Sequence, residues 1–228
     1  MNIRNFFYTT IIVVSTVVAI NAQTFDSKSI LKRGDVLVAQ EKYKPAIEEY
    51  LKVSPHDADS YARAVYNIGV CHYELWQTDE AIEFYKRAIE LKRGNYPRAS
   101  YALGVALEDQ GKTTEAKAAY EQAVNTSQRE FARATYRLGL IEARTGELRK
   151  AAALFREAAQ RAGEHVPASH NNLGVMLAQL GFLKEAEQEF VIALRQANGD
   201  FADAAHNLNL CRSLTASLKP NYKISTID

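Results

Sequence analysis

The sequence repeats itself at an interval of 35 residues. The stretches "ARAVYNIG" (62–69), "PRASYALG" (97–104) and "ARATYRLG" (132–139) each hold an arginine in second place, a tyrosine in fifth and a glycine in eighth. Glycine recurs at this spacing five times, and an asparagine takes the sixth position: Gly34, Gly69, Gly104, Gly139, Gly174 and Asn209. An interval of 20–50 residues is typical of chains that stack one structural unit on the next. We therefore expect a stacked array.

Three further positions repeat in the same register as the glycines. An alanine follows each glycine after twelve residues, an aromatic residue comes four residues later, and a small apolar residue comes three residues after that. In two of the copies these are Ala81, Tyr85 and Ala88, and Ala186, Phe190 and Ala193. Spacings of three and four place residues on one face of a helix. Each copy therefore indicates two helices, one around the glycine and one around the aromatic residue.

The repeated small residues predict close contact between the two helices of a copy. Antiparallel helices approach closely only where no bulky side chain stands at the crossing. A glycine inside a helix costs about 1 kcal/mol relative to alanine, so five of them indicate that close packing stabilises more than this. We expect the large aromatic residue to fill the space that remains against the neighbouring copy.

A second set of glycines marks the turn between the two helices. Gly111, Gly146 and Gly181 stand where the first helix should end, and a glycine there closes a helix in the left-handed conformation. The first two copies depart from this pattern and have Glu41 and Trp76 at this turn. Two interpretations of Trp76 stay open: it docks on a neighbouring loop, or it belongs to an exposed contact surface.

This pattern resembles the tetratricopeptide repeat, which has the same order of Leu-Gly, Gly, Ala, aromatic and Ala, over about residues 27–200. The resemblance implies an all-α fold, a right-handed α-solenoid of antiparallel helix pairs. It implies five units, which we place at 27–61, 62–96, 97–131, 132–166 and 167–201. A lone helix at 202–216 would cap the apolar end of the array. Residues 217–228 show no helical pattern, and we expect a flexible tail.

The resemblance also implies a binding surface, because the corresponding first-helix positions line the concave groove that receives peptide in this family. The residues at these positions are Arg63, Tyr66, Asn67, Val70, Arg98, Tyr101, Arg133, Tyr136, Arg137 and Asn172. Tyrosine offers a rigid amphipathic surface and arginine a planar fork for carboxylates, a combination that suits an extended, acidic or aromatic segment. A structural alternative stays open, in which each tyrosine packs on the next unit and each arginine pairs with a local acid.

The first 22 residues have the layout of a secretory signal peptide. A short start with Arg4 as its one charge precedes the apolar run "FFYTTIIVVSTVVAI", and "NAQ" follows it. The run is shorter than the roughly twenty apolar residues that span a bilayer. We expect cleavage after Ala22, export, and a periplasmic or secreted protein without a membrane span. The alternative is an uncut N-terminal membrane anchor.

Charge and composition exclude several classes of function. The chain has 28 basic and 27 acidic residues, and loss of the signal would leave it neutral, so it has no generic attraction for nucleic acid. Cys71 and Cys211 suggest two buried small apolar residues rather than a disulfide-built module. The histidines form no zinc motif, and no nucleophile, base and orienting group come together. We therefore expect no enzyme, no metal site and no cofactor.

The sequence thus predicts an exported interaction module that binds a protein or peptide in its groove without chemistry. The expected setting is envelope or secretion assembly. Two alternatives stay open. In one the array is a regulatory or cell-wall-glycan-binding module, with its tyrosines stacked on sugar rings. In the other it is a scaffold that assembles as a homo-oligomer through Trp76 or the weakly marked first copy.

Overall fold

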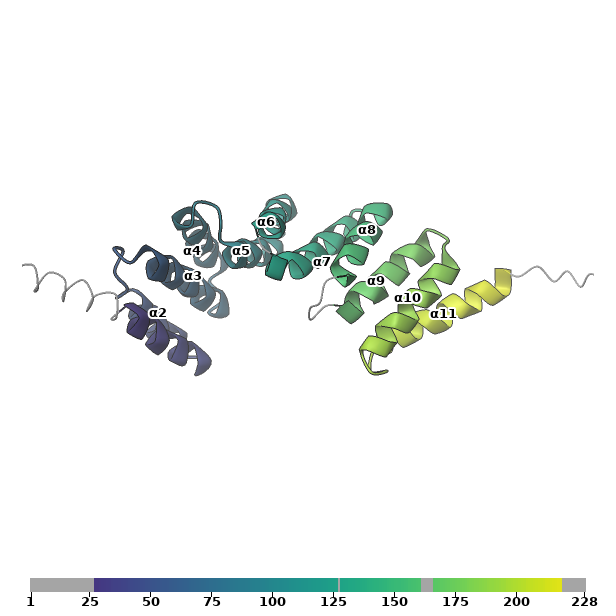
Figure 1. Ribbon diagram of the computed structural model, residues 1–228, viewed down its shortest axis with the longest axis horizontal. Helices are drawn as coiled ribbons and strands as arrows, with labels where there is room; N and C mark the ends of the chain where they lie inside the picture. Colours follow the sequence, from purple (N-terminus) through teal and green to yellow (C-terminus); the bar gives the residue numbers. More distant parts are fainter. Residues whose placement is uncertain (1–26, 127, 161–165, 219–228) are drawn as a thin grey trace, which may run out of the picture. The chain divides into compact units, whose positions relative to one another are not determined.

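The computed structural model describes residues 27–126, 128–160 and 166–218, and every regular element in these stretches is a helix (Figure 1). The predicted signal at 1–22 lies outside the described residues, as does the predicted tail from residue 219 on. Residues 27–39 are helical and are followed by α2 (Tyr43–Tyr50), α3 (Ala58–Glu74), α4 (Thr78–Leu91), α5 (Pro97–Asp109), α6 (Thr113–Thr126), α7 (Gln128–Arg144), α8 (Leu148–Ala159), α9 (Val166–Gln179), α10 (Leu183–Gln196) and α11 (Ala202–Leu218).

The helices belong to two compact units that meet in the sequence between Lys112 and Thr113. In the first unit α3 packs on α2, α4 and α5, and in the second each helix from α7 to α10 packs on the helices before and after it. The first helices also touch one another, α3 with α5 and α9 with α11. The predicted fold class, an all-helical solenoid of helix pairs, is thereby confirmed. None of the helices in the described residues has the length and apolar character needed to cross a membrane.

The repeated glycines make room for the aromatic ring of their own repeat. A β-carbon added at Gly174 would come within 2.6 Å of the Phe190 ring, and one at Gly69 within 2.8 Å of the Tyr85 ring. Such separations are shorter than van der Waals contact, so only glycine lets the ring lie flat on the first helix. The expectation that the ring fills space against the neighbouring copy is therefore incomplete, because the ring first covers its own glycine.

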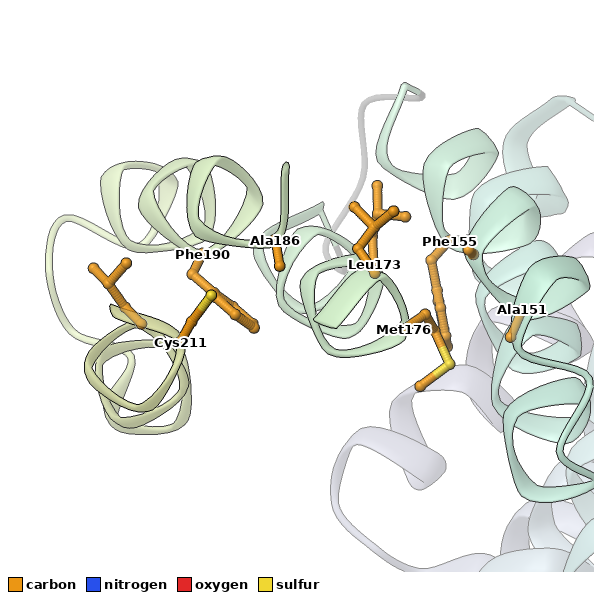
Figure 2. Packing of buried hydrophobic residues seen from close by; sticks show 10 residues of the cluster. Ala151, Phe155, Leu173, Met176, Ala186, Phe190 and Cys211 are labelled. Atoms are coloured by element: carbon orange, nitrogen blue, oxygen red, sulfur yellow. The ribbon is translucent and has the colours of Figure 1, made fainter. Parts of the chain in front are cut away.

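The rings also join successive repeats. In the second unit Phe155 lies in one buried cluster with Leu173 and Met176 of the following first helix, α9 (Figure 2). Phe190 and Cys211 continue this cluster to α11, so the last helix covers the apolar side of α10. Cys71 is likewise buried in the first unit, and both cysteines are free thiols. The interpretation of the cysteines as buried apolar residues is confirmed.

The turn after each first helix has the left-handed conformation that the sequence indicates. The φ angles are +72° at Gly111, +82° at Gly146 and +88° at Gly181. Glu41 and Trp76 adopt the same conformation, with φ of 58° and 61°. For a residue with a β-carbon this conformation costs roughly 1–2 kcal/mol. The first two repeats therefore keep the geometry of the turn without its usual residue.

Trp76 is 91 % exposed, the largest exposed fraction among the bulky apolar residues of the described chain. The interpretation in which Trp76 docks on a neighbouring loop is therefore wrong. The physical reason is the direction of the left-handed turn, because a β-carbon added at Gly111, Gly146 or Gly181 would meet no atom within 4 Å. A side chain at this position points into open space.

Gly174→Ala should lower the free energy of unfolding by about 1–2 kcal/mol, because overpacking costs about 1–3 kcal/mol and the higher helix propensity of alanine offsets about 1. Phe190→Leu should relieve the overlap, so the double variant should be more stable than the two single effects predict. Urea unfolding measures this coupling. Gly181→Ala is the matched control, since it strains the backbone without touching the ring and should combine additively with Phe190→Leu. Additive effects at Gly174 would contradict the packing.

Candidate functional site

The predicted ligand-contacting residues lie on the first helices of successive repeats, and we call the face they form the first-helix surface. In the first unit they come from α3 and α5, and in the second from α7 and α9. Because the two units are separate bodies, each part of this surface is described on its own.

In the first unit, three side chains converge on the carboxylate of Asp35. Arg63 Nη2 lies 2.5 Å from one oxygen, and Asn67 Nδ2 and the Tyr50 hydroxyl donate to the other at 3.1 and 2.8 Å. Burial and the nearby Asp35 carboxylate raise the pKa of Tyr50. Arg63 and Asn67 therefore tie α3 to the preceding first helix, which is what the structural alternative expects of them.

Tyr66 also has a packing function. Its ring centre lies 5.8 Å from that of Tyr85 and 5.4 Å from that of Tyr96, so three rings from successive elements meet. Burial raises the pKa of the Tyr96 hydroxyl, while the positive charges of Arg98 and Arg63 act in the opposite direction. Tyr66 is half-buried and keeps part of its surface accessible.

Arg98 differs from Arg63 in what surrounds it. Arg98 is exposed on α5, and Tyr101 lies half-buried one turn further along the same helix. The position that holds Asp35 in the first repeat holds Val70 in the second. A valine side chain cannot accept a hydrogen bond, so Arg98 has no counterpart of the Asp35 contact.

In the second unit, a chain of amide hydrogen bonds crosses the first helices. Asn172 Nδ2 donates to the Tyr136 hydroxyl at 3.2 Å, Asn171 Nδ2 donates to Asn172 Oδ1 at 3.2 Å, and Asn207 Nδ2 donates to Asn171 Oδ1 at 3.0 Å. These bonds link α7, α9 and α11. A carboxamide has two N–H donors and two acceptor lone pairs, so the half-buried Asn172 and Asn207 retain capacity for another bond, whereas Asn171 is buried between them.

Tyr136 supports this chain from α7. Its ring centre lies 5.7 Å from that of Phe155, and the half-buried Arg133 and Arg137 stand on either side of it in the sequence. Burial raises the pKa of Tyr136, and the hydrogen bond from Asn172 opposes that shift. Tyr136 thus holds Asn172 in place at one end of the amide chain.

A pocket of about 260 Å³ opens beside Asn207 on the second unit. It lies among α9, α10 and α11, and its lining is mostly apolar: Val175, Ala178, Gln179, Phe190, Asn207, Leu210, Cys211 and Leu214. Leu210 and Leu214 are 52 % and 44 % exposed at its mouth. Neither leucine is among the ligand-contacting residues that the sequence predicts. The repeat register held the signal for one of them, because Leu210 follows Asn209 as Val70 follows Gly69.

The described residues contain no group of three or more His, Cys, Asp and Glu side chains that could hold a metal ion. His72 stacks on Phe84 with ring centres 5.1 Å apart, and His170 Nδ1 lies 2.6 Å from a Glu189 oxygen.

Asp35→Ala should lower the free energy of unfolding by about 1–3 kcal/mol, because it leaves the buried Tyr50 hydroxyl without an acceptor. Arg63→Ala should cost less than about 1 kcal/mol, since its pair with Asp35 is solvent-exposed. Urea unfolding distinguishes the two. Tyr50→Phe in the Asp35→Ala background should recover part of the loss. An equal loss from Arg63→Ala would show that the ion pair, not the hydroxyl, stabilises this junction.

Comparison with known proteins gives matches in both sequence and structure. Residues 62–95 and 101–167 match models of the tetratricopeptide repeat. A search of curated proteins found no significant match.

Three solved structures illustrate the similarity of the fold. MamA from Desulfovibrio magneticus RS-1 is 20 % identical over 77 % of this chain and 97 % of that one, with a TM-score of 0.62. YrrB, described as a TPR protein with an unusual peptide-binding site, is 22 % identical over 83 % and 95 %, with a TM-score of 0.61. PilF of Pseudomonas aeruginosa is 16 % identical over 88 % and 95 %, with a TM-score of 0.66. At these identities the likeness establishes the fold alone. The chain thus contains tetratricopeptide repeats at 62–95 and 101–167 and folds as an α-solenoid.

Proposed function

We propose that this chain is a non-enzymatic scaffold that binds an extended segment of another protein on its first-helix surface. The observation that carries the proposal is the apolar pocket beside the amide chain of the second unit. An extended peptide presents alternating side chains and a row of main-chain N–H and C=O groups. The second unit offers a partner for each, the pocket for a side chain and the half-buried Asn172 and Asn207 for the main chain.

The size of the pocket defines the side chain that it suits. Its volume of about 260 Å³ is just below the ~300–1,000 Å³ that enclose drug-sized ligands. One bulky apolar side chain is therefore the fitting occupant. Asn207 lines the pocket and belongs to the amide chain, so a peptide anchored there would pass directly over amide donors and acceptors.

The first unit offers a different contact. Arg98 is exposed, lacks a counterpart of the Asp35 contact, and stands one turn from Tyr101 on α5. Such a pair suits a carboxylate or an aromatic side chain of the bound segment. Tyr66 and Tyr136 already contact neighbouring rings, which leaves less ring surface for stacking on sugars. We therefore propose a protein segment in preference to a cell-wall glycan.

Two further points support the proposal by analogy and from the sequence. YrrB, which shares the fold, is described as having a peptide-binding site. The signal-like residues 1–22 favour an exported protein, either periplasmic or secreted, and we place its partner in envelope or secretion assembly.

Leu210→Glu should abolish binding to an array of synthetic peptides with single bulky apolar residues, because it puts a charge at the mouth of the pocket. Leu210 is 52 % exposed, so the melting temperature should change by less than about 2 °C. Leu51→Glu is the matched control, since Leu51 is 65 % exposed and lies outside the first-helix surface. Unchanged peptide binding by Leu210→Glu would exclude the pocket as the site.

Replacement of Arg98 and Tyr101 together by alanine should weaken the same peptide binding at least about tenfold and leave the melting curve nearly unchanged. Binding should fall most for peptides with an acidic or aromatic residue, as measured on the same array. Arg87→Ala, which removes an exposed arginine from the second helix α4, should bind as the unaltered chain does. A large loss of stability in the double variant would mean that these two residues serve packing.

A further inference from the structure

The turn between α3 and α4 carries a residue that the fold does not require. Three equivalent turns use Gly111, Gly146 and Gly181, and the backbone at Trp76 has the same left-handed conformation. Trp76 accepts the strain of that conformation and remains 91 % exposed, so its indole ring adds almost nothing to the buried core. Tryptophan is also among the residues most enriched in the contacts that dominate protein interfaces.

The charges around this turn are also unlike those of its counterparts. Residues 74–83 hold four exposed acids and no base: Glu74, Asp79, Glu80 and Glu83. The equivalent stretches 39–48 and 109–118 are balanced, 179–188 has one net negative charge, and 144–153 has two net positive charges. The strongest local negative charge therefore coincides with the exposed tryptophan.

Local structure accounts for only part of this charge. Asp79 and Glu80 lie in the first turn of α4, where a negative charge stabilises the helix by its interaction with the helix dipole. Asp79 also accepts a hydrogen bond from Gln110, and Glu83 pairs with Lys86. Glu74, however, is the last residue of α3, where the dipole disfavours an acid. Neither capping nor pairing explains why an acid stands there, two residues before an exposed indole.

We propose that Trp76 and its flanking carboxylates bind a basic segment of a partner protein, with a lysine or arginine side chain on the face of the indole. The tryptophan ring is the best aromatic partner for a cation, and the exposed carboxylates close to it in the sequence complement further positive charges and repel acidic partners. This site lies on the turn and uses none of the residues assigned to the first-helix surface. It therefore stands whether or not that surface binds peptide.

Trp76 is the only tryptophan of the chain, so its fluorescence reports on this site alone. A peptide of four arginines should change the emission in a saturable manner and protect the ring from quenching by acrylamide. The apparent affinity should fall at least about tenfold between low salt and 0.5 M NaCl, because carboxylates supply much of the attraction. A peptide of four citrullines, which keeps the shape without the charge, should have no effect. An equal response to both peptides would overturn the proposal.

Two variants test the assignment of residues. Glu74→Gln with Asp79→Asn and Glu80→Gln keeps the fluorophore and should weaken arginine-peptide binding at least about tenfold. Trp76→Gly with Gly146→Trp moves the tryptophan to the turn with net positive charge, where no atom lies within 4 Å of an added β-carbon. Circular dichroism should confirm the fold of both variants, and the moved tryptophan should not respond. A response at residue 146 equal to that at residue 76 would contradict the proposal.

A third outcome concerns self-association. If the Trp76 emission changes with protein concentration in the absence of peptide, and sedimentation shows a dimer that Trp76→Gly abolishes, the occupant is a second copy of this chain. That result would overturn the proposal of a basic partner segment. An emission independent of protein concentration, together with the response to the arginine peptide, supports it.

Discussion

The contact on which the structure depends is an aromatic ring laid directly on a glycine. Phe190 on Gly174 and Tyr85 on Gly69 have the same geometry in different repeats, so the same contact joins the two helices of both pairs. The ring then reaches the first helix of the next repeat, as Phe155 reaches Met176. In arrays whose repeats contact mainly their neighbours, the stability is approximately a sum of such local contacts. One small residue per repeat therefore determines how the chain stacks.

The features that the sequence predicted are those set by residues close in the chain. The glycine, the aromatic residue and the turn recur within each 35-residue copy, so periodicity alone indicated the helix pairs and the left-handed turns. Contacts between copies were harder to predict. The Asp35 contacts of Arg63 and Asn67 come from an acid found at that position only in the first copy, and pattern matching across copies passes over such an exception. The pocket at α11 was also not predicted, because it is lined by side chains of α9, α10 and α11 and so depends on contacts between copies.

The repeated arginines and tyrosines consequently do not form one uniform ladder. Arg63 pairs with Asp35, whereas the equivalent position before Arg98 holds Val70. Tyr66 and Tyr136 contact the rings of neighbouring residues. The same residue type can thus be paired within the fold in one repeat, as Arg63 is, and be exposed for ligand contact in the next, as Arg98 is. The difference lies in a single neighbour, and it makes Arg98 a better candidate for ligand contact than Arg63.

The turns show the opposite relation between sequence and structure. Their backbone conformation is constant, yet an added β-carbon meets nothing at Gly111, Gly146 or Gly181. The turn therefore fixes the backbone conformation but places no limit on the size of the side chain. A residue other than glycine costs roughly 1–2 kcal/mol there because of the left-handed backbone. Trp76 has this unfavourable backbone conformation, and its side chain is not buried, so the fold is not stabilised by the tryptophan. The identity of such a residue must then be explained by what it presents at the surface, which is why an exposed tryptophan among four acids indicates a binding site.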